Sequence, residues 1–474
     1  IRFRPNKHWD FTYAFHYSET TDYARYDRLN RTRNGLPRSA EWSYGPQIWQ
    51  LNQLQAEHRK RTALYDQARL SLAHQYFEES RIDRNFGSPI RRTRTEQVDA
   101  LSANLDFTKS LGSTQRLMYG LETIYNRVGS RGQLEDITTG GQQPGPARYP
   151  QSDWSSYAAY LTWQVEAAEQ LQLQAGARYN AFALQADFDT TFFPFPFTEA
   201  QLQNGALTGS LGATYRPAQS WLLRANLSTG FRAPNIDDVG KVFDSEPGAV
   251  VVPNPQLQSE YAYNAELSVS RAVGSWLQAE LTGYYTLLDN ALVRRDFRLN
   301  GQDSIIYDGE LSRVQAIQNA ARARVWGLQA AFDAQLPAGF GLSARLNVQE
   351  GVETLEEGGE VPLRHAAPWF GVLRLSYEQE ALRVELNAQY HSAFDFEDLP
   401  PGEQAKPELY AADANGNPFA PDWYTLDFRA LYRVSDTFTL SAGVENLTDR
   451  RYRPYSSGLA GPGRSVVLSG RVQF

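Results

Sequence analysis

The most constraining feature of the sequence is an alternation of apolar and polar residues that recurs along the whole chain. From Leu382 to His391, even positions carry leucine, valine, alanine and tyrosine, and odd positions carry charged or amide side chains and histidine. Segments 263–270 and 277–287 repeat the pattern. Because successive side chains of a β-strand point to opposite faces, each such segment predicts a strand with one apolar and one polar face. We count about eighteen such strands.

The connections between these strands alternate in length. The short turns fall at 110–113, 216–218, 273–275, 336–339, 378–380 and 435–437. The long polar or Pro/Gly-rich stretches fall near 18–46, 79–93, 128–152, 188–203, 232–259, 294–312, 351–366, 395–421 and 449–463. Short turns at one end and long loops at the other are typical of an outer-membrane barrel. The predicted fold class is therefore all-β, a transmembrane antiparallel β-barrel in the bacterial outer membrane, with the lipid bilayer and lipopolysaccharide around it.

A large soluble all-β protein, such as a propeller or a stack of sandwiches, is the structural alternative. Those folds have short strands with turns every ~8–12 residues and apolar inward faces. Here the strands are longer, and their polar faces are charged throughout, which suits a wet lumen better than a second packed sheet.

Composition excludes several classes of function. No segment approaches the ~20 consecutive apolar residues of a membrane-spanning helix. The net charge of −8 argues against a nucleic-acid partner. The 6 histidines are scattered and there is no cysteine, so no metal site or cofactor is predicted. Neither a His-Glu-x-x-His nor a Gly-x-Ser-x-Gly motif is present, so an enzyme is not expected.

The C-terminal segment 464–474 predicts the orientation of the barrel. Val466, Leu468, Gly470 and Val472 share one face with the terminal residue, Phe474. A terminal phenylalanine on an amphipathic strand resembles the signal read by the outer-membrane assembly machinery, and it would lie in the periplasmic aromatic girdle. The short turns are then periplasmic and the long loops extracellular.

Several motifs of the C-terminal half resemble those of TonB-dependent receptors. Gly230-Phe231-Arg232-Ala233-Pro234 is similar to the family's "GFRAP" box. The run 254–260, with Asn254, Pro255 and Glu260, resembles its "NPxLxxE" box. Residues 444–452, with Asn446 and Asp449, followed by Gly463-Arg464, resemble its C-terminal signature, and Arg364-His365-Ala366-Ala367-Pro368 is a further recurring feature.

These motif residues have structural reasons for their positions. Pro234 stands where a strand leaves the membrane, because proline cannot donate to a ladder. Asn254-Pro255 starts a turn, and Asn446 and Asp449 can hydrogen-bond their own backbone. We therefore interpret Phe231, Arg232, Pro234, Asn254, Pro255, Glu260, Asn446, Asp449 and Phe474 as architectural residues.

The resemblance implies a larger protein than this chain. Family members have a 22-stranded barrel filled by an N-terminal plug, with a box before the plug that contacts TonB. We expect residues 1–474 to be the barrel domain, with the plug and about four strands preceding Ile1. The implied partners are the TonB energy-coupling complex, through that preceding region, and a small-molecule cargo; a surface lipoprotein is a further candidate. The implied function is active uptake without covalent chemistry.

Two other barrels remain open as alternatives. An eighteen-stranded substrate-specific porin would be a passive channel, and an adhesive barrel would bind a macromolecule with its loops.

The cargo of a receptor is predicted only by default, as an iron–siderophore complex. Haem, cobalamin, glycan and peptide cargoes remain open, although the loop 235–253 lacks the histidine that haem receptors of the family usually carry. Exposed aromatic clusters tend to mark binding surfaces. The candidate ligand-binding residues are accordingly Phe192, Phe193, Phe195, Phe197, Asp237, Asp238 and Phe243. The alternative is that these phenylalanines pack the loop onto its neighbours or lie in the upper aromatic girdle.

Overall fold

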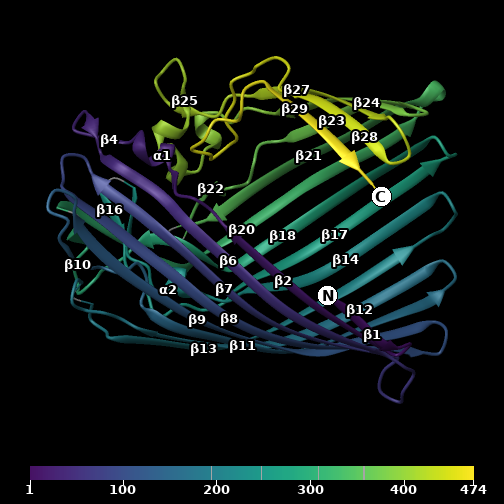
Figure 1. The fold of residues 1–474 in the computed structure, drawn as a ribbon, viewed down its shortest axis with the longest axis horizontal. Coiled ribbons are helices and arrows are strands. Elements are labelled where there is room, and N and C mark those ends of the chain that lie inside the picture. The colour runs from purple at the N-terminus through teal and green to yellow at the C-terminus, as the bar shows by residue number, and fades with distance from the viewer. Residues whose placement is uncertain (194, 247, 308, 356–357, 474) are drawn as a thin grey trace.

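A computed structural model describes residues 1–473 except 194, 247, 308 and 356–357; for 243–246 and 320–321 it describes the backbone alone. Within the described residues, nineteen long or short strands form the wall of the barrel. Figure 1 shows their arrangement. They are β1 (Arg2–Asn6), β2 (Trp9–Glu19), β6 (Ser39–Arg59), β7 (Gln67–Asn85), β8 (Ile90–Leu111), β9 (Gln115–Asp136), β11 (Gln151–Ala168), β12 (Leu171–Asp187), β13 (Glu199–Tyr215), β14 (Trp221–Arg232), β17 (Glu260–Val273), β18 (Leu277–Asp296), β20 (Glu310–Gln335), β21 (Phe340–Thr354), β23 (Phe370–Gln379), β24 (Leu382–His391), β27 (Trp423–Arg433), β28 (Phe438–Glu445) and β29 (Ser465–Val472).

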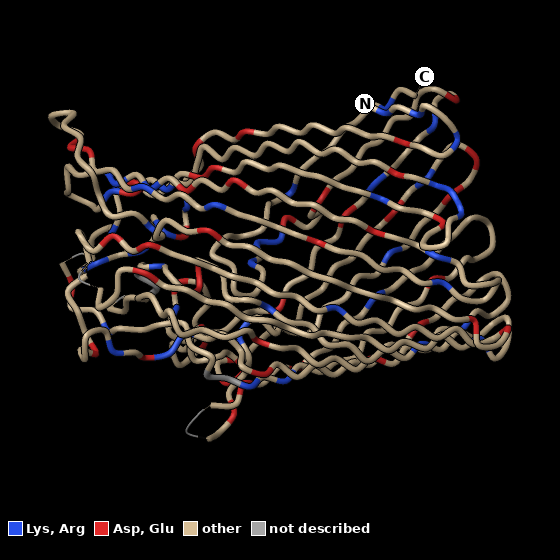
Figure 2. The backbone as a smooth tube through the Cα atoms, turned by 90° about the horizontal axis from the view of Figure 1, so that it is seen from below, with Lys and Arg blue, Asp and Glu red and all other residues tan. Residues whose placement is uncertain are grey.

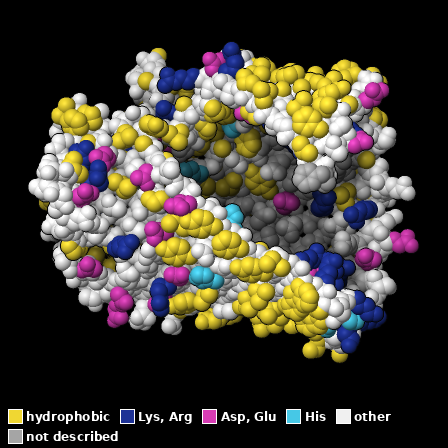
Figure 3. All heavy atoms as spheres, in the orientation of Figure 1, with side chains coloured by type: hydrophobic (Ala, Val, Ile, Leu, Met, Phe, Trp, Pro, Cys, Tyr) yellow, Lys and Arg dark blue, Asp and Glu magenta, His cyan; other side chains and the backbone are white. Residues whose placement is uncertain are grey.

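Each wall strand pairs antiparallel with the next one along the chain, so the topology is a simple meander. The sheet curls around a hollow, and its two outermost strands, β1 and β29, lie on either side of an opening (Figures 1 and 3). This confirms the predicted antiparallel barrel fold. The hollow seen in Figure 3 lies behind that opening.

The register confirms that the alternation sorts side chains onto two faces. On one face, Leu211 of β13 pairs with Leu227 of β14 and is 60% exposed. On the other face, Asn104 of β8 pairs with Glu122 of β9 and donates a hydrogen bond to it at 2.9 Å. The exposed apolar face is the lipid-facing exterior, and the polar face lines the lumen. Figure 2 shows charged residues along the wall as well as at its two ends.

The longest strands extend far beyond the membrane. β8 and β9 are each 22 residues long, and β20 is 26. A barrel strand needs only about 9–11 residues to cross the hydrocarbon core. The upper halves of these strands therefore stand above the bilayer and support the loops. Among the described residues, no helix is long and apolar enough to span a membrane.

One local expectation from the sequence is wrong, and one short strand was missed. The stretch 79–93 is not a long loop, because β7 continues to Asn85 and β8 begins at Ile90. Its alternating charges pair across strands instead: Arg84 and Arg91 both bind Glu41, at 2.9 and 2.8 Å. The short strand β1 was not predicted. The side chain of Asn6 accepts hydrogen bonds from the backbone amides of His8 and Trp9 and so closes the turn into β2.

The long loops at the extracellular end of the barrel contain nearly all of the remaining elements. These are β3 (Tyr23–Ala24), α1 (Tyr26–Leu29), β4 (Thr32–Arg33), β5 (Leu36–Pro37), β10 (Gln142–Gly145), α2 (Ile236–Gly240), β15 (Phe243–Glu246), β16 (Ala249–Val251), β19 (Ser304–Tyr307), β22 (Glu360–Pro362), α3 (Pro401–Gln404), β25 (Ala411–Ala412) and β26 (Pro418–Phe419). Three single-turn helices lie at Pro337–Gly339, Phe396–Asp398 and Pro407–Leu409. Except for Pro337–Gly339, which sits in a short turn, these elements lie at the extracellular mouth.

Candidate functional site

The hydrophobic core of the protein lies at its extracellular mouth. At the upper ends of β12 and β13 the inward face turns apolar, where Leu184 pairs with Leu202 and Ala186 with Ala200. All four side chains are at most 4% exposed. Loop residues cover them: Phe188, Val239 and Leu257 belong to the same buried cluster. The loops therefore fold inward over the lumen, because the strands present them with an apolar surface to cover.

The aromatic loop between β12 and β13 divides into a packed part and an exposed part. The rings of Phe195 and Phe197 stack with centroids 5.9 Å apart and contact Phe188 edge-on, so they pack against the buried cluster. Phe192 is 38% exposed. The ring of Phe193 stacks on that of Tyr307 from β19 at 6.2 Å. The loop therefore both packs onto its neighbours and presents aromatic surface.

This exposed aromatic surface borders a cavity of about 590 Å³. Loops that are distant in sequence build its walls: the aromatic loop, the loop that contributes Val242 and Val252, and the residues around β19. The lining residues are Arg92, Arg94, Pro146, Phe192, Phe193, Phe195, Val242, Val252, Leu299, Asn300, Gln302, Ser304, Ile305, Ile306, Tyr307 and Leu311. Apolar and aromatic walls with few polar groups are typical of ligand sites.

Two arginines give the cavity its charge. Arg92 and Arg94 both lie on the inward face of β8, two positions apart. Both bind Asp83 of β7, which is 6% exposed. Asp83 accepts from Nε of Arg92 at 2.7 Å and from Nη1 of Arg94 at 3.1 Å. The buried carboxylate orients both guanidinium groups, and the three side chains together carry one net positive charge. The cavity can therefore receive an anionic aromatic ligand.

Asp237 and Asp238 are held by internal partners. Asp238 completes a capping box with Asn235 at the start of α2 and binds Arg232 at 2.6 Å. Asp237 accepts hydrogen bonds from Tyr149 and Lys241. Both carboxylates therefore anchor the loop between β14 and β17. Only the backbone of Phe243 is described, in β15, so its predicted ligand role lies outside the described side chains.

The motif residues of this region lie together at the tops of β14 and β17. Arg232 reaches Glu260, whose second oxygen accepts from the backbone of Leu292 at 2.8 Å. The amide of Asn254 donates to the carbonyl of Ile317 at 2.8 Å. Pro234 is fully buried, whereas Pro255 and Phe231 are partly buried. These contacts connect neighbouring strands to the loop above them.

The C-terminal motif shapes the last extracellular loop. Asn446 and Asp449 have left-handed backbones, with φ of 48° and 52°. The Asn446 side chain donates to the carbonyls of Arg450 and Pro462, and Asp449 accepts from the backbone of Arg464 at 2.8 Å. Phe474 lies outside the described residues.

A buried carboxyl that the sequence did not single out lies beside this loop system. Glu96 on the inward face of β8 is 6% exposed and accepts one long hydrogen bond from Ser130, at 3.4 Å. Its other oxygen has no hydrogen-bond partner. Burial raises the pKa of Glu96 to about 7. The residue lies fifteen positions from the periplasmic end of β8, above the ~10-residue segment that crosses the membrane.

A second such carboxyl, Glu403, joins the loop 395–421 to the loop before β23. Its side chain is fully buried and binds Arg364 at 2.7 Å, Lys406 at 3.0 Å and the hydroxyl of Tyr410 at 2.6 Å. Burial alone would raise the pKa of Glu403, but the hydrogen bond from Tyr410 and the two cations outweigh it, and the pKa is lowered. The ionised carboxylate therefore holds the loop 395–421 against the one before β23.

Sequence reasoning missed Arg92, Arg94, Asp83, Tyr307, Glu96 and Glu403. The two arginines could have been found, because arginines two positions apart on a strand share a face. Tyr307 and Glu403 carried no local signal, since their contacts are with residues distant in sequence. Among the described residues, no group of three or more His, Cys, Asp or Glu side chains could hold a metal ion.

Comparison with known proteins identifies the family. The family model described as "TonB dependent receptor-like, beta-barrel" matches residues 2–447. The hemoglobin-haptoglobin utilization protein B of Neisseria meningitidis is 24% identical over 61% of this chain and 38% of its own length. The hemoglobin and hemoglobin-haptoglobin-binding protein of Haemophilus ducreyi is 28% identical over 52% of this chain and 27% of its own length. The chain therefore spans less than half the length of these relatives.

Solved structures share the fold over the whole chain. The copper transporter OprC superposes with a TM-score of 0.78 at 15% identity, covering 100% of this chain and 70% of that one. The ferric yersiniabactin uptake receptor FyuA from Yersinia pestis gives a TM-score of 0.69 at 16% identity, covering 100% and 69%. Such relatives are receptors and transporters, not enzymes, as the sequence indicated. The strand meander, the sorted faces and the match over residues 2–447 show that the chain belongs to the TonB-dependent receptor family, the β-barrels of the bacterial outer membrane.

Proposed function

We propose that the protein takes up a bulky anionic nutrient across the outer membrane by TonB-dependent active transport, with an iron–siderophore complex as the cargo. The observation that carries the proposal is the cavity at the mouth. It combines the Phe193–Tyr307 stack with the two guanidinium groups that Asp83 orients. Ferric siderophores offer the complementary chemistry, namely aromatic or extended rings together with carboxylate or phenolate oxygens.

The relatives support an iron-related cargo. An iron-regulated outer membrane virulence protein of Vibrio cholerae is 25% identical over 54% of this chain. Energy coupling would require the TonB complex, contacted by a plug domain that precedes Ile1, together with about four further strands that complete a 22-stranded barrel. The opening between β1 and β29 is where such strands would pair.

The test uses the full-length receptor in cells deleted for the native gene. We expect iron-limited growth on ferric siderophores to fail without the receptor and to return with it. The double variant Arg92→Gln/Arg94→Gln should weaken cargo binding about tenfold or more, because a charge-assisted hydrogen bond contributes about 1.5–3 kcal/mol. Arg345→Gln is the matched control, because this arginine pairs with Asp333 near the periplasmic end of the wall.

Two outcomes would contradict the proposal. If no iron-limited phenotype and no siderophore binding appear, the cargo is wrong. If uptake continues after the proton-motive force is dissipated, the protein is a passive channel of the porin type.

Haem is the second candidate cargo, favoured by the names of the two relatives described above and by one exposed histidine. His365 precedes β23 with a left-handed backbone at φ 69°. Partial burial and the neighbouring Arg364 lower the pKa of His365, so its imidazole is neutral at physiological pH and able to ligate iron. If haem is the cargo, His365→Ala should abolish growth on haem while leaving growth on ferric siderophores unchanged.

A further inference from the structure

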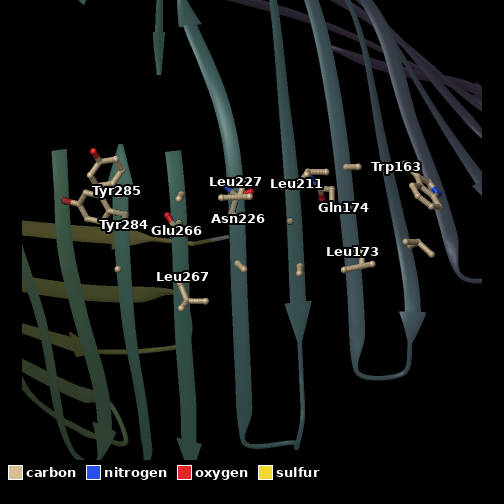
Figure 4. A pocket seen from close by; sticks show the side chains of 17 residues that line it. Trp163, Leu173, Gln174, Leu211, Asn226, Leu227, Glu266, Leu267, Tyr284 and Tyr285 are labelled. Carbon is tan, nitrogen blue, oxygen red and sulfur yellow. The ribbon is translucent and has the colours of Figure 1, made fainter. Parts of the chain in front are cut away.

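The lipid-facing side of the wall carries an apolar groove across β11, β12, β13, β14, β17 and β18 (Figure 4). Two hollows of about 880 and about 680 Å³ make it up, and they share Leu211, Leu227, Ala265 and Tyr285. The two hollows therefore form one continuous groove.

The floor of the groove consists of small side chains on neighbouring strands. Ala213 of β13 pairs with Ala225 of β14, and Ala177 of β12 pairs with Gly209 of β13. Large side chains rise around this floor: Trp163 and Tyr285 lie toward opposite sides of it in Figure 4. Leucine and aromatic side chains occupy outward positions around it, among them Leu173, Leu207 and Leu267, so the alanines and glycines between them leave a depression.

The register shows that the groove faces the membrane and not the lumen. Leu227 and Ala265 pair directly and therefore share a face with the exposed Leu211. The next residues, Asn226 and Glu266, pair with each other on the opposite, polar face. In a barrel with a wet interior, the apolar face is the one that contacts lipid.

An outward arginine, Arg271, lies beyond the groove toward the periplasmic turns, separated from Leu267 by one outward position, Val269. Arg271 of β17 pairs with Trp221 of β14 on the outward face, and its guanidinium lies 4.8 Å over the indole ring. It lies four residues along β17 from Leu267, roughly 13 Å away at about 3.3 Å per residue. β17 ends two residues later at the short turn after Val273. In the described part of the chain, no carboxylate pairs with Arg271.

We propose that this groove binds one phospholipid of the periplasmic leaflet, with its phosphate at Arg271 and an acyl chain lying over the alanine and glycine floor. The inference rests on the membrane-spanning barrel and is independent of the cargo. Lipid tails are as apolar as leucine, so a specific lipid is retained by shape fit and by its head group rather than by hydrophobicity. The arginine supplies the charge complement for a phosphate.

The position of the charge favours this occupant over two others. Lipopolysaccharide places its phosphates at the extracellular end, whereas Arg271 lies at the end of the short turns. A second barrel would have to fill the depression with a protruding ridge, and it would have no need of an arginine beside a tryptophan at the rim.

The experiment uses the full-length receptor, purified in mild detergent and analysed by native mass spectrometry. The wild type should retain a phospholipid after delipidation. Arg271→Gln should lower that retention about fivefold. The groove-filling double variant Ala225→Leu/Ala265→Leu should lower it further by occupying the volume of the acyl chain. Heat-modifiable migration on gels would verify that each variant is folded before binding is measured.

Matched controls separate the groove from general lipid contact. Arg127→Gln removes an outward arginine in the extracellular half of β9, and Ala103→Leu enlarges an outward alanine of β8. Neither should change the retention. The proposal is overturned if the wild type retains no phospholipid, if the controls lose as much as the groove variants, or if the bound species is lipopolysaccharide or a second receptor.

Discussion

At the scale of single residues, Glu96 and Glu403 are both buried carboxyls, but their surroundings favour opposite charge states: neutral for Glu96 and ionised for Glu403. Glu403 has three partners for its charge, whereas Glu96 has one weak hydrogen bond and an unpaired oxygen. Burying a charge is unfavourable unless partners replace its hydration. Glu403 therefore stabilises the loops when ionised, and Glu96 does so when neutral.

The Glu96 prediction concerns pH. Its folded-state pKa of about 7 lies above the ordinary value of 4.5, so the folded state favours the protonated form. The stabilisation is complete below pH 4.5 and is lost as the pH rises through 7. Glu96→Gln should abolish this pH dependence and make the loops above β8 more stable than wild type at pH 8. Hydrogen exchange of residues 128–150 at pH 5 and pH 8 measures the stability of these loops. If the variant keeps the pH dependence of the wild type, the role assigned to Glu96 is wrong.

The Glu403 prediction concerns the contact between the loop 395–421 and the loop before β23, which we call the latch. Glu403→Gln should destabilise the closed loop by about 3 kcal/mol, since removing one partner of a buried ion pair leaves the others uncompensated. The loss stays at about 3 kcal/mol, and not higher, because Arg364 is 46% exposed and water replaces part of its lost interaction. Limited proteolysis of residues 395–421 measures the opening. Glu397→Gln, at an exposed position in the same loop, should stay within about 0.5 kcal/mol of wild type, and equal cleavage of both variants would refute the latch.

At the scale of elements, strands and loops follow different rules. The strands were predicted well because alternation is a local property, and every predicted strand segment is present. The loop 79–93 was misassigned because its charges looked like solvent-exposed residues, whereas Arg84 and Arg91 bind Glu41 across strands. Whether a charged segment is a loop or an extended ribbon depends on partners that a sequence window does not contain.

The short helix α2 offers an element-scale prediction. Asn235 accepts from the backbone of Asp237 and Asp238 in a capping box, which holds Asp238 beside Arg232. Asn235→Ala should destabilise the loop between β14 and β17 by about 1 kcal/mol. Hydrogen exchange of residues 235–253 measures the loss. Asn235→Asp, which preserves the acceptor, should restore protection, and failure of that rescue would exclude the cap as the cause.

At the scale of the whole molecule, the barrel depends on which face meets lipid. Leu211→Arg places a charge on the lipid-facing side, where it should destabilise the fold by about 2–4 kcal/mol near the bilayer midplane. Asn226→Arg places the same charge on the polar inner face of the adjacent strand and should be tolerated. The folded fraction, read from heat-modifiable migration in urea, distinguishes them. Equal losses would mean that the two faces are assigned wrongly.

The sequence by itself determined the strands, the two faces, the end with short turns and the family, because each of these follows from side-chain direction along one strand or from a contiguous motif. The tertiary structure alone decided that the aromatic loop folds inward onto Leu184 and Leu202, that Asp83 orients Arg92 and Arg94, and that Glu403 joins two loops. These contacts join residues from different loops and strands, and they form only where the apolar upper ends of the strands bring those segments together over the lumen.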